Sequence, residues 1–202
     1  MALTIFRILM KMFEKKSIVD YLKQYNLFTD SEINEFISLA TISTIKKGDF
    51  FIKHDEMCTT LSFVNFGIFR SFYYSNNDEE ITYCFTFPNT LLVAYSSFIT
   101  QNKSEENLQA LTDSEIISIS KKELENLAES NNKWLNFLKI IAEKEYVELE
   151  KWIFNHQKSN AQKRYLDLIH SNPQIVQQIP LHYIASYLGI TQRHLSRIRA
   201  SI

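Results

Sequence analysis

The segment 180–199 constrains the fold of this chain more than any other part of the sequence. Apolar residues recur at helical spacing on both sides of Gly189, and glycine permits the left-handed conformation of a tight turn. Ala185 supplies a small residue where two steeply crossed helices would touch. Thr191 is placed to cap the second helix. The segment is therefore predicted to form a helix-turn-helix, with these inward positions: Ile184, Leu188, Ile190 and Ile198.

The second predicted helix, 191–199, carries polar and basic side chains on the face turned away from the first. In a helix-turn-helix this face enters the major groove, where Arg pairs with guanine and Gln with adenine through two hydrogen bonds. The alternative is an ordinary helical hairpin with a solvated arginine face. The predicted DNA-binding residues are Thr191, Gln192, Arg193, His194, Ser196, Arg197 and Arg199.

Charge is distributed unevenly along the chain. Residues 155–202 carry six Lys or Arg and one Asp, a net charge of +5, whereas residues 1–154 carry 16 basic and 22 acidic side chains, a net charge of −6. A cationic end on an anionic body indicates a polyanionic partner for that end alone. With the helix pattern, this favours double-stranded DNA. Contacts to phosphates are expected from Lys158, Lys163, Arg164 and Arg199.

Short β-branched and aromatic runs fill residues 41–120, with no long helical pattern among them. About eight strands in this length predict an antiparallel roll or barrel. The polar residues 76–78 supply the turn of one hairpin. Two helices are expected within residues 17–40, the second capped by Asp30 or Ser31.

One long helix is expected from Asn131 or Asn132 to about Asn155. Besides a stripe of apolar residues along one side, this helix carries further apolar residues such as Trp134 and Trp152, so it is apolar on more than one side. It is either a core helix of its own chain or a dimer interface, and the second interpretation is favoured because a two-sided helix needs a second partner surface. The stripe steps by three or four residues through Leu135, Leu138, Ala142, Tyr146, Leu149 and Ile153.

The predicted fold class is α+β, an antiparallel double-stranded β-helix of the jelly-roll type followed by a dimerisation helix and a helix-turn-helix domain. The expected boundaries are 1–130, 131–156 and 157–202. The apolar stretch Leu3–Met12 is far shorter than the ~20 residues of a membrane span and has no signal-peptide cleavage pattern. It is expected to be an N-terminal helix, or to precede a true start at Met12, in a cytoplasmic protein without membrane contact.

Several short motifs stand out along residues 17–200: Lys46–Asp49, Phe63–Gly67 with Arg70, Tyr165–Leu166, Tyr183–Thr191 and Leu195–Arg199. With the order of elements, they resemble the Crp/Fnr family of bacterial transcription regulators, and the terminal motif is similar to the Bacteroidetes-type branch. The resemblance implies a homodimer paired through the long helix, with two recognition helices on half-sites about 34 Å apart in a palindrome. RNA polymerase is a further implied partner.

An effector in the roll would change how the two DNA-binding domains sit, but the sequence departs from the family's cyclic-nucleotide binders. Val93 and Ala94 replace their Gly-Glu pair, and no arginine lies between Arg70 and Arg164 to hold a phosphate. We therefore expect no cyclic nucleotide and no cofactor, and either an unknown small ligand or none. The candidate ligand-lining residues, which are otherwise roll core, are Phe72, Tyr83, Phe85, Val93, Ala94, Tyr95, Ser96 and Ser97.

The sequence lacks the residues that metal centres and the common classes of enzyme require. Cys58 and Cys84 are too few for an iron–sulfur cluster, and His54 is the single histidine of the predicted roll, so no metal site is expected. No hydrolase, metalloprotease or phosphate-loop motif occurs, so neither catalytic residues nor an enzyme are predicted. Two alternatives stay open: a regulator that does respond to a cyclic nucleotide or other small ligand, and a β-roll interaction module with little DNA affinity.

Overall fold

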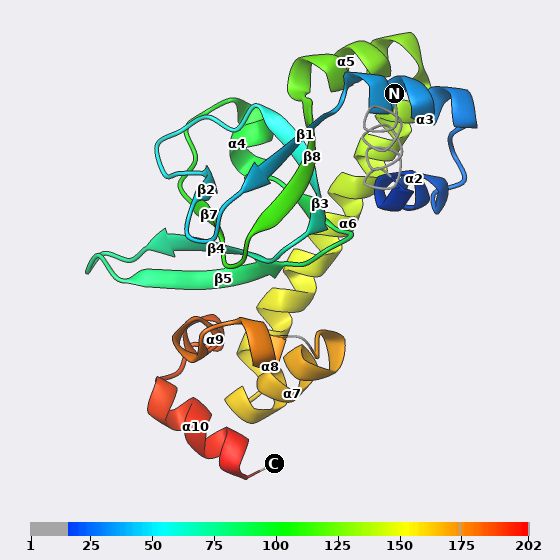
Figure 1. Cartoon of the computed structure of the whole chain (residues 1–202). Coiled ribbons are helices and arrows are strands. Elements are labelled where there is room, and N and C mark those ends of the chain that lie inside the picture. The colour runs from blue at the N-terminus through cyan, green and yellow to red at the C-terminus, as the bar shows by residue number, and fades with distance from the viewer. Residues whose placement is uncertain (1–15, 174, 202) are drawn as a thin grey trace, which may run out of the picture.

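The computed structural model describes residues 16–173 and 175–201 (Figure 1). The expected N-terminal helix over Leu3–Met12 lies outside these residues. The first described elements are α2 (Lys16–Lys23) and α3 (Asp30–Leu39). The predicted cap of α3 at Asp30 or Ser31 is wrong, because Thr29 is the N-cap residue. Its extended backbone lets its hydroxyl accept from the Glu32 N–H while the Glu32 carboxylate accepts from the Thr29 N–H, at 3.3 and 2.7 Å.

Eight antiparallel strands follow, as the alternation of apolar residues predicted. They form two four-stranded sheets, in the orders β1-β8-β3-β6 and β2-β7-β4-β5. Apolar side chains from both sheets form one core with α2, α3, α5 and α6, and we call this unit the β-roll. The strands are β1 (Thr41–Ile45), β2 (Phe50–Ile52), β3 (Thr60–Phe66), β4 (Phe69–Tyr74), β5 (Glu80–Thr86), β6 (Leu91–Leu92), β7 (Asn107–Ala110) and β8 (Ser114–Ser120).

The β4–β5 hairpin extends beyond the rest of the β-roll (Figure 1). Its turn is closed by a 2.9 Å bond from the Ser75 N–H to the Glu79 carbonyl, with Asp78 in the left-handed region, so the predicted hairpin is confirmed. At the start of β4, Gly67 has a φ of +100°, and a Cβ there would come within 2.0 Å of Ser114 Oγ. Only glycine fits this position. The short helix α4 (Tyr95–Thr100) lies between β6 and β7.

Two helices leave the β-roll. The first, α5 (Lys121–Ser130), starts at a capping box between Ser120 and Glu123, and Asn131 then caps α6 (Asn132–Lys158). The long helix runs from α5 past the β-roll to the C-terminal helices (Figure 1). Near its start, Trp134 is fully buried, and its ring stacks on those of Phe28 and Phe36 at centroid distances of 4.0 and 5.2 Å. The first third of α6 is therefore part of the β-roll core.

Four helices complete the chain: α7 (Ala161–Ser171), α8 (Ile175–Gln178), α9 (Leu181–Tyr187) and α10 (Gln192–Ala200). Their buried residues form a second core, separate from that of the β-roll. Ile68, Phe85 and Leu111 of the β-roll also belong to this second core. The C-terminal helices therefore pack against the β-roll through apolar contacts as well as through the covalent link from α6.

Candidate functional site

The turn between α9 and α10 is held by a Schellman motif. The Gly189 N–H bonds to the Ser186 carbonyl and the Ile190 N–H to the Ala185 carbonyl, both at 3.0 Å. Gly189 has the left-handed φ of +66° that this motif requires. Thr191 then caps α10, its hydroxyl accepting from the His194 N–H at 3.2 Å, as predicted. The local sequence thus sets both the end of α9 and the start of α10.

The inner faces of α9 and α10 are packed tightly together. Ala185 is buried, and Leu188 and Leu195 are completely buried. Tyr165 and Leu168 of α7 close the same cluster. With its inner face fixed in this way, α10 presents its remaining side chains outward as one rigid surface.

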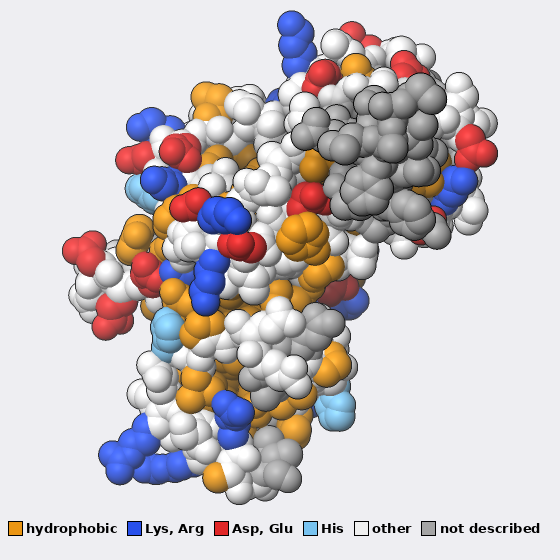
Figure 2. Space-filling view, in the orientation of Figure 1, with side chains coloured by type: hydrophobic (Ala, Val, Ile, Leu, Met, Phe, Trp, Pro, Cys, Tyr) orange, Lys and Arg blue, Asp and Glu red, His pale blue; other side chains and the backbone are white. Residues whose placement is uncertain are grey.

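All seven residues predicted to bind DNA lie exposed on or beside α10. Within residues 16–173 and 175–201, no acidic side chain pairs with Arg193, Arg197 or Arg199. Lys and Arg side chains gather at the α10 end of the molecule, whereas acidic side chains gather at the tip of the β4–β5 hairpin (Figure 2). The outer face of α10 is therefore an exposed cationic surface whose arginines have no acidic partner in the part of the chain that the structure describes.

Arg164 does not belong to that surface. Its Nη2 donates to the Leu188 carbonyl at 2.7 Å and its Nη1 to the Ser159 carbonyl, so the guanidinium joins the end of α6 to the end of α9. The expectation that it contacts a phosphate is not supported by this geometry, because the side chain is half-buried, each terminal nitrogen donates to a backbone carbonyl and the Nε atom is buried. Lys158 and Lys163 remain exposed.

The long helix α6 carries both buried and exposed apolar side chains. Trp134, Phe137 and Ile141 point into the β-roll core. The predicted stripe is divided between the two sides. Leu138 packs against the β-roll core and Ala142 is half-buried, whereas Leu135, Tyr146 and Leu149 are 58, 67 and 55% exposed. Side chains of this size rarely lie exposed together on one helix unless they have a partner.

The eight candidate ligand-lining residues do not surround one cavity. Phe72 is completely buried, with the Arg70 guanidinium 3.9 Å from its ring centre. Tyr83 and Phe85 line a cleft of about 750 Å³ between β5, α6 and α7. The other five form the segment 93–97, which leads into α4, and there the Ser97 hydroxyl accepts from the Cys58 N–H at 2.9 Å and donates to the Asn102 carbonyl at 2.5 Å.

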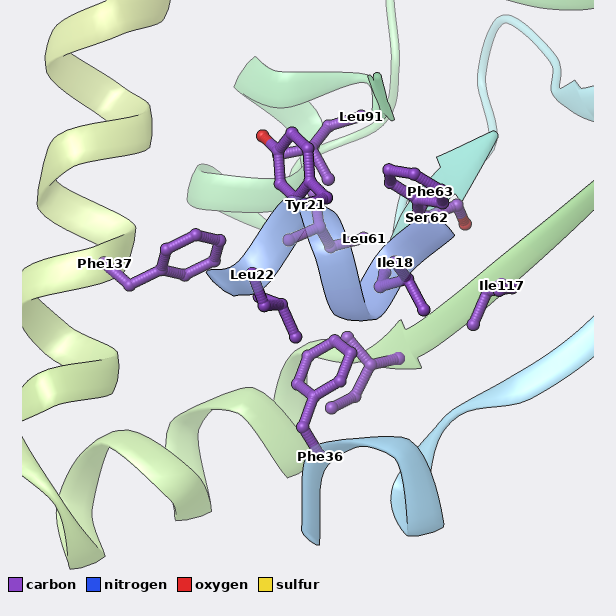
Figure 3. Close-up of a pocket in the computed structure, with 11 residues that line it drawn as sticks. Ile18, Tyr21, Leu22, Phe36, Leu61, Ser62, Phe63, Leu91, Ile117 and Phe137 are labelled. Carbon is purple, nitrogen blue, oxygen red and sulfur yellow. The ribbon is translucent and has the colours of Figure 1, made fainter. Parts of the chain in front are cut away.

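A second cavity of about 10 Å³ lies between α2, α6 and the sheet that contains β3 (Figure 3). None of the eight candidates lines it. Its walls are nearly all apolar, with Leu22, Phe63 and Phe137 among them, and its volume matches a single water molecule. It is a packing defect of the core and is too small for an effector.

Glu106, which lies just before β7, was not among the residues predicted from the sequence. The Tyr83 hydroxyl donates to the Glu106 carboxylate in a short hydrogen bond. Burial raises the pKa of Glu106, and the bond from Tyr83 partly opposes that shift. Burial and the neighbouring carboxylate raise the pKa of Tyr83 in turn. A carboxylate held here would repel an anionic ligand, and only the acidic run 105–106 pointed to it in the sequence.

The described residues contain no group of three or more His, Cys, Asp or Glu side chains placed to hold a metal ion. No helix in that part of the chain is both long and apolar enough to cross a membrane.

The β-roll is similar to a known protein family. Residues 42–131 match the cyclic nucleotide-binding domain family. No curated protein matches the sequence. Solved structures that resemble this chain include several Crp/Fnr-family regulators, and their TM-scores show a shared fold despite low sequence identity.

Three of these structures span most of the chain. FixK2 from Bradyrhizobium japonicum has a TM-score of 0.72 at 16% identity, covering 80% of this chain and 83% of its own. A Crp/Fnr-family regulator from Eubacterium rectale has a TM-score of 0.69 at 17% identity, with coverages of 90% and 87%. The c-di-GMP-responsive regulator CLP from Xanthomonas campestris has a TM-score of 0.61 at 14% identity, with coverages of 86% and 91%.

Proposed function

We propose that this protein, which has the fold of Crp/Fnr regulators, is a homodimeric transcription regulator of the bacterial cytoplasm that binds a palindromic site in double-stranded DNA. It falls in the Bacteroidetes-type branch, and RNA polymerase is its further protein partner. The observation that carries the proposal is the outer face of α10, where Arg193, Arg197 and Arg199 are exposed and have no acidic partner among the described residues.

In this proposal α10 enters the major groove with its N-terminal turn first. Gln192 and Arg193 contact base edges, Ser196 and Arg197 follow one turn later, and Thr191 lies near a phosphate. The exposed Lys163 contributes a contact to the DNA backbone. The Schellman turn and the buried inner face support this role, because base contacts need a helix whose orientation is fixed before binding.

The exposed stripe of α6 supports pairing of two copies through this helix. Its spacing of three or four residues suits packing against an identical helix. A two-fold pair of this kind places two copies of α10 on the same side of a duplex, at half-sites about one helical turn apart.

The β-roll of this regulator does not take a cyclic nucleotide as its effector. The segment 93–97 carries no arginine, and the Ser97 hydroxyl is already bonded on both sides. The Glu106 side chain, which adds to the burial that raises the pKa of Cys58 beside Ser97, supplies no positive charge there. An anion placed there would lose its hydration without gaining an opposite charge. Any effector is thus a small molecule of another kind.

The experiment that tests the proposal is a selection of random duplex DNA by the purified protein at two salt concentrations, without added ligand. Enrichment of a palindrome with half-sites one turn apart is expected, with affinity falling steeply as salt rises. Tyr146→Glu should abolish dimers in sedimentation and with them the palindrome, whereas Lys144→Glu, on the same helix, should preserve both. No enrichment and no salt dependence would overturn the proposal.

A further inference from the structure

The strand β5 is the edge of its sheet, and α9 packs against it (Figure 1). An edge strand exposes backbone groups that no neighbouring strand satisfies. Here the Ser186 hydroxyl of α9 accepts from the Thr82 N–H at 2.9 Å and donates to the Glu80 carbonyl at 3.2 Å. A single side chain of α9 thus replaces part of a missing strand, and such bonds fix position along β5 in a way that apolar contact does not.

Beside Ser186, α9 also covers Arg70 of β4. This arginine is 2% exposed, and its guanidinium carbon lies 3.9 Å from the ring centre of Phe72 and 3.8 Å from that of Tyr183. Its Nη2 donates to Glu80 at 2.5 Å and to Gln109 at 2.8 Å. A buried cation needs compensating neighbours, and here the Glu80 carboxylate and the ring faces of Phe72 and Tyr183 supply them. Among the described residues Nη1 has no hydrogen-bond partner, so the ring of Tyr183 matters all the more.

We call this contact the α9 dock, formed by Arg70, Phe72, Thr82, Tyr183 and Ser186. Its two parts come from segments about a hundred residues apart in the sequence. Leu188 at the end of α9 and Ile198 of α10 belong to the same buried cluster as Phe85 of β5. The orientation of α10 is therefore tied, through α9, to the β-roll.

We propose that the α9 dock is the positioning device that sets the half-site spacing of the dimer, with Arg70, Tyr183 and Ser186 as its positioning residues. This inference rests on the proposed function. If two copies pair through α6, the distance between their recognition helices depends on where each α9 sits on its own β-roll. A docked α9 permits one distance, and therefore one spacing of half-sites. An undocked α9, held to α6 by Arg164 and by the contact of His156 with the Tyr187 carbonyl, permits several.

The test uses the full chain and duplexes that carry the selected half-sites at a series of spacings. The double variant Tyr183→Leu/Ser186→Ala should lose the preference for the best spacing by about tenfold or more, while its affinity for a single half-site stays that of wild type. Tyr183→Phe keeps the ring over Arg70 and should keep the wild-type spacing preference. Ser171→Ala, an exposed serine of α7, controls for loss of a hydroxyl.

A second measurement does not depend on DNA. Hydrogen exchange of the Thr82 amide should be slow in wild type and in Tyr183→Phe, and faster in the double variant, which should melt as one cooperative unit. A double variant that keeps the spacing preference despite a freed Thr82 amide would overturn the proposal, and so would a Thr82 amide that exchanges rapidly in wild type. If wild type binds no DNA, the proposed function fails, and the exchange data separately decide whether the dock exists.

Discussion

In the β-roll, two polar side chains that could hold a ligand, Tyr83 and Ser97, already have hydrogen-bond partners, whereas the arginines on the outer face of α10 have no acidic partner among the described residues. Tyr83 donates to Glu106, and Ser97 is bonded to the backbone on both sides. On α10, Arg193 and Arg197 extend into solvent. The difference shows which surface can bind a partner. Polar groups that already have hydrogen bonds gain little binding free energy from a ligand, whereas exposed unpaired charges gain it from a polyanion.

The largest expected effect tests the packed core of the β-roll. Trp134→Ala should cost about 3–5 kcal/mol of unfolding free energy, because it leaves a cavity where Phe28 and Phe36 stack. Arg193→Ala on α10 should stay within about 0.5 kcal/mol of wild type. Denaturant titration measures both. Equal stability of the two variants would show that the first turns of α6 are not part of the core.

The next largest effect tests the DNA-binding surface around α10. Arg197→Ala should weaken binding to the selected palindrome by about 1–3 kcal/mol while leaving non-specific binding nearly intact, because it removes a contact to a base. Lys163→Ala should weaken both kinds of binding alike and lower the salt slope by about 1. Titrations of labelled DNA at several salt concentrations separate the two. Equal losses for Arg197→Ala on cognate and random DNA would assign Arg197 to the backbone instead.

A smaller effect concerns the buried carboxylate. Because burial raises the pKa of Glu106 in the folded protein, its contribution to stability is full below the pKa of the unfolded chain and is lost as pH rises through the folded pKa. Glu106→Gln removes this loss, and its amide oxygen can still accept from Tyr83. The stability of the variant relative to wild type should therefore increase from about pH 4 towards neutrality. Melting curves over this range that stay parallel would contradict a raised pKa.

The smallest expected effect is none at all. Cyclic AMP at millimolar concentration should change neither the melting temperature nor the heat of mixing, since Glu106 and the bonded Ser97 offer a phosphate no opposite charge. Sodium sulfate at matched ionic strength controls for non-specific effects of salt. A saturable shift with cyclic AMP alone would show that another group of the β-roll holds the phosphate.

Local patterns predicted much of this molecule. Alternating apolar residues predicted eight strands, the caps Asn131 and Thr191 predicted where α6 and α10 begin, and Gly189 predicted the turn between α9 and α10. The cap of α3 was missed because Thr29, Asp30 and Ser31 are all good capping residues and only the extended backbone of Thr29 distinguishes them. These features depend on residues a few positions apart, which the sequence itself displays.

Contacts between distant segments were not predictable in the same way. Arg164 was expected on the DNA-binding surface, yet the structure brings it carbonyl groups from the ends of α6 and α9. The bond between Tyr83 and Glu106, and the stacking of Tyr183 on Arg70, join residues that no local pattern relates. The sequence by itself determined the elements, the capped turn and the charge of α10, because these follow from neighbouring residues. Only the tertiary structure decided which polar groups are already paired, because pairing depends on where the packed core places each chain segment.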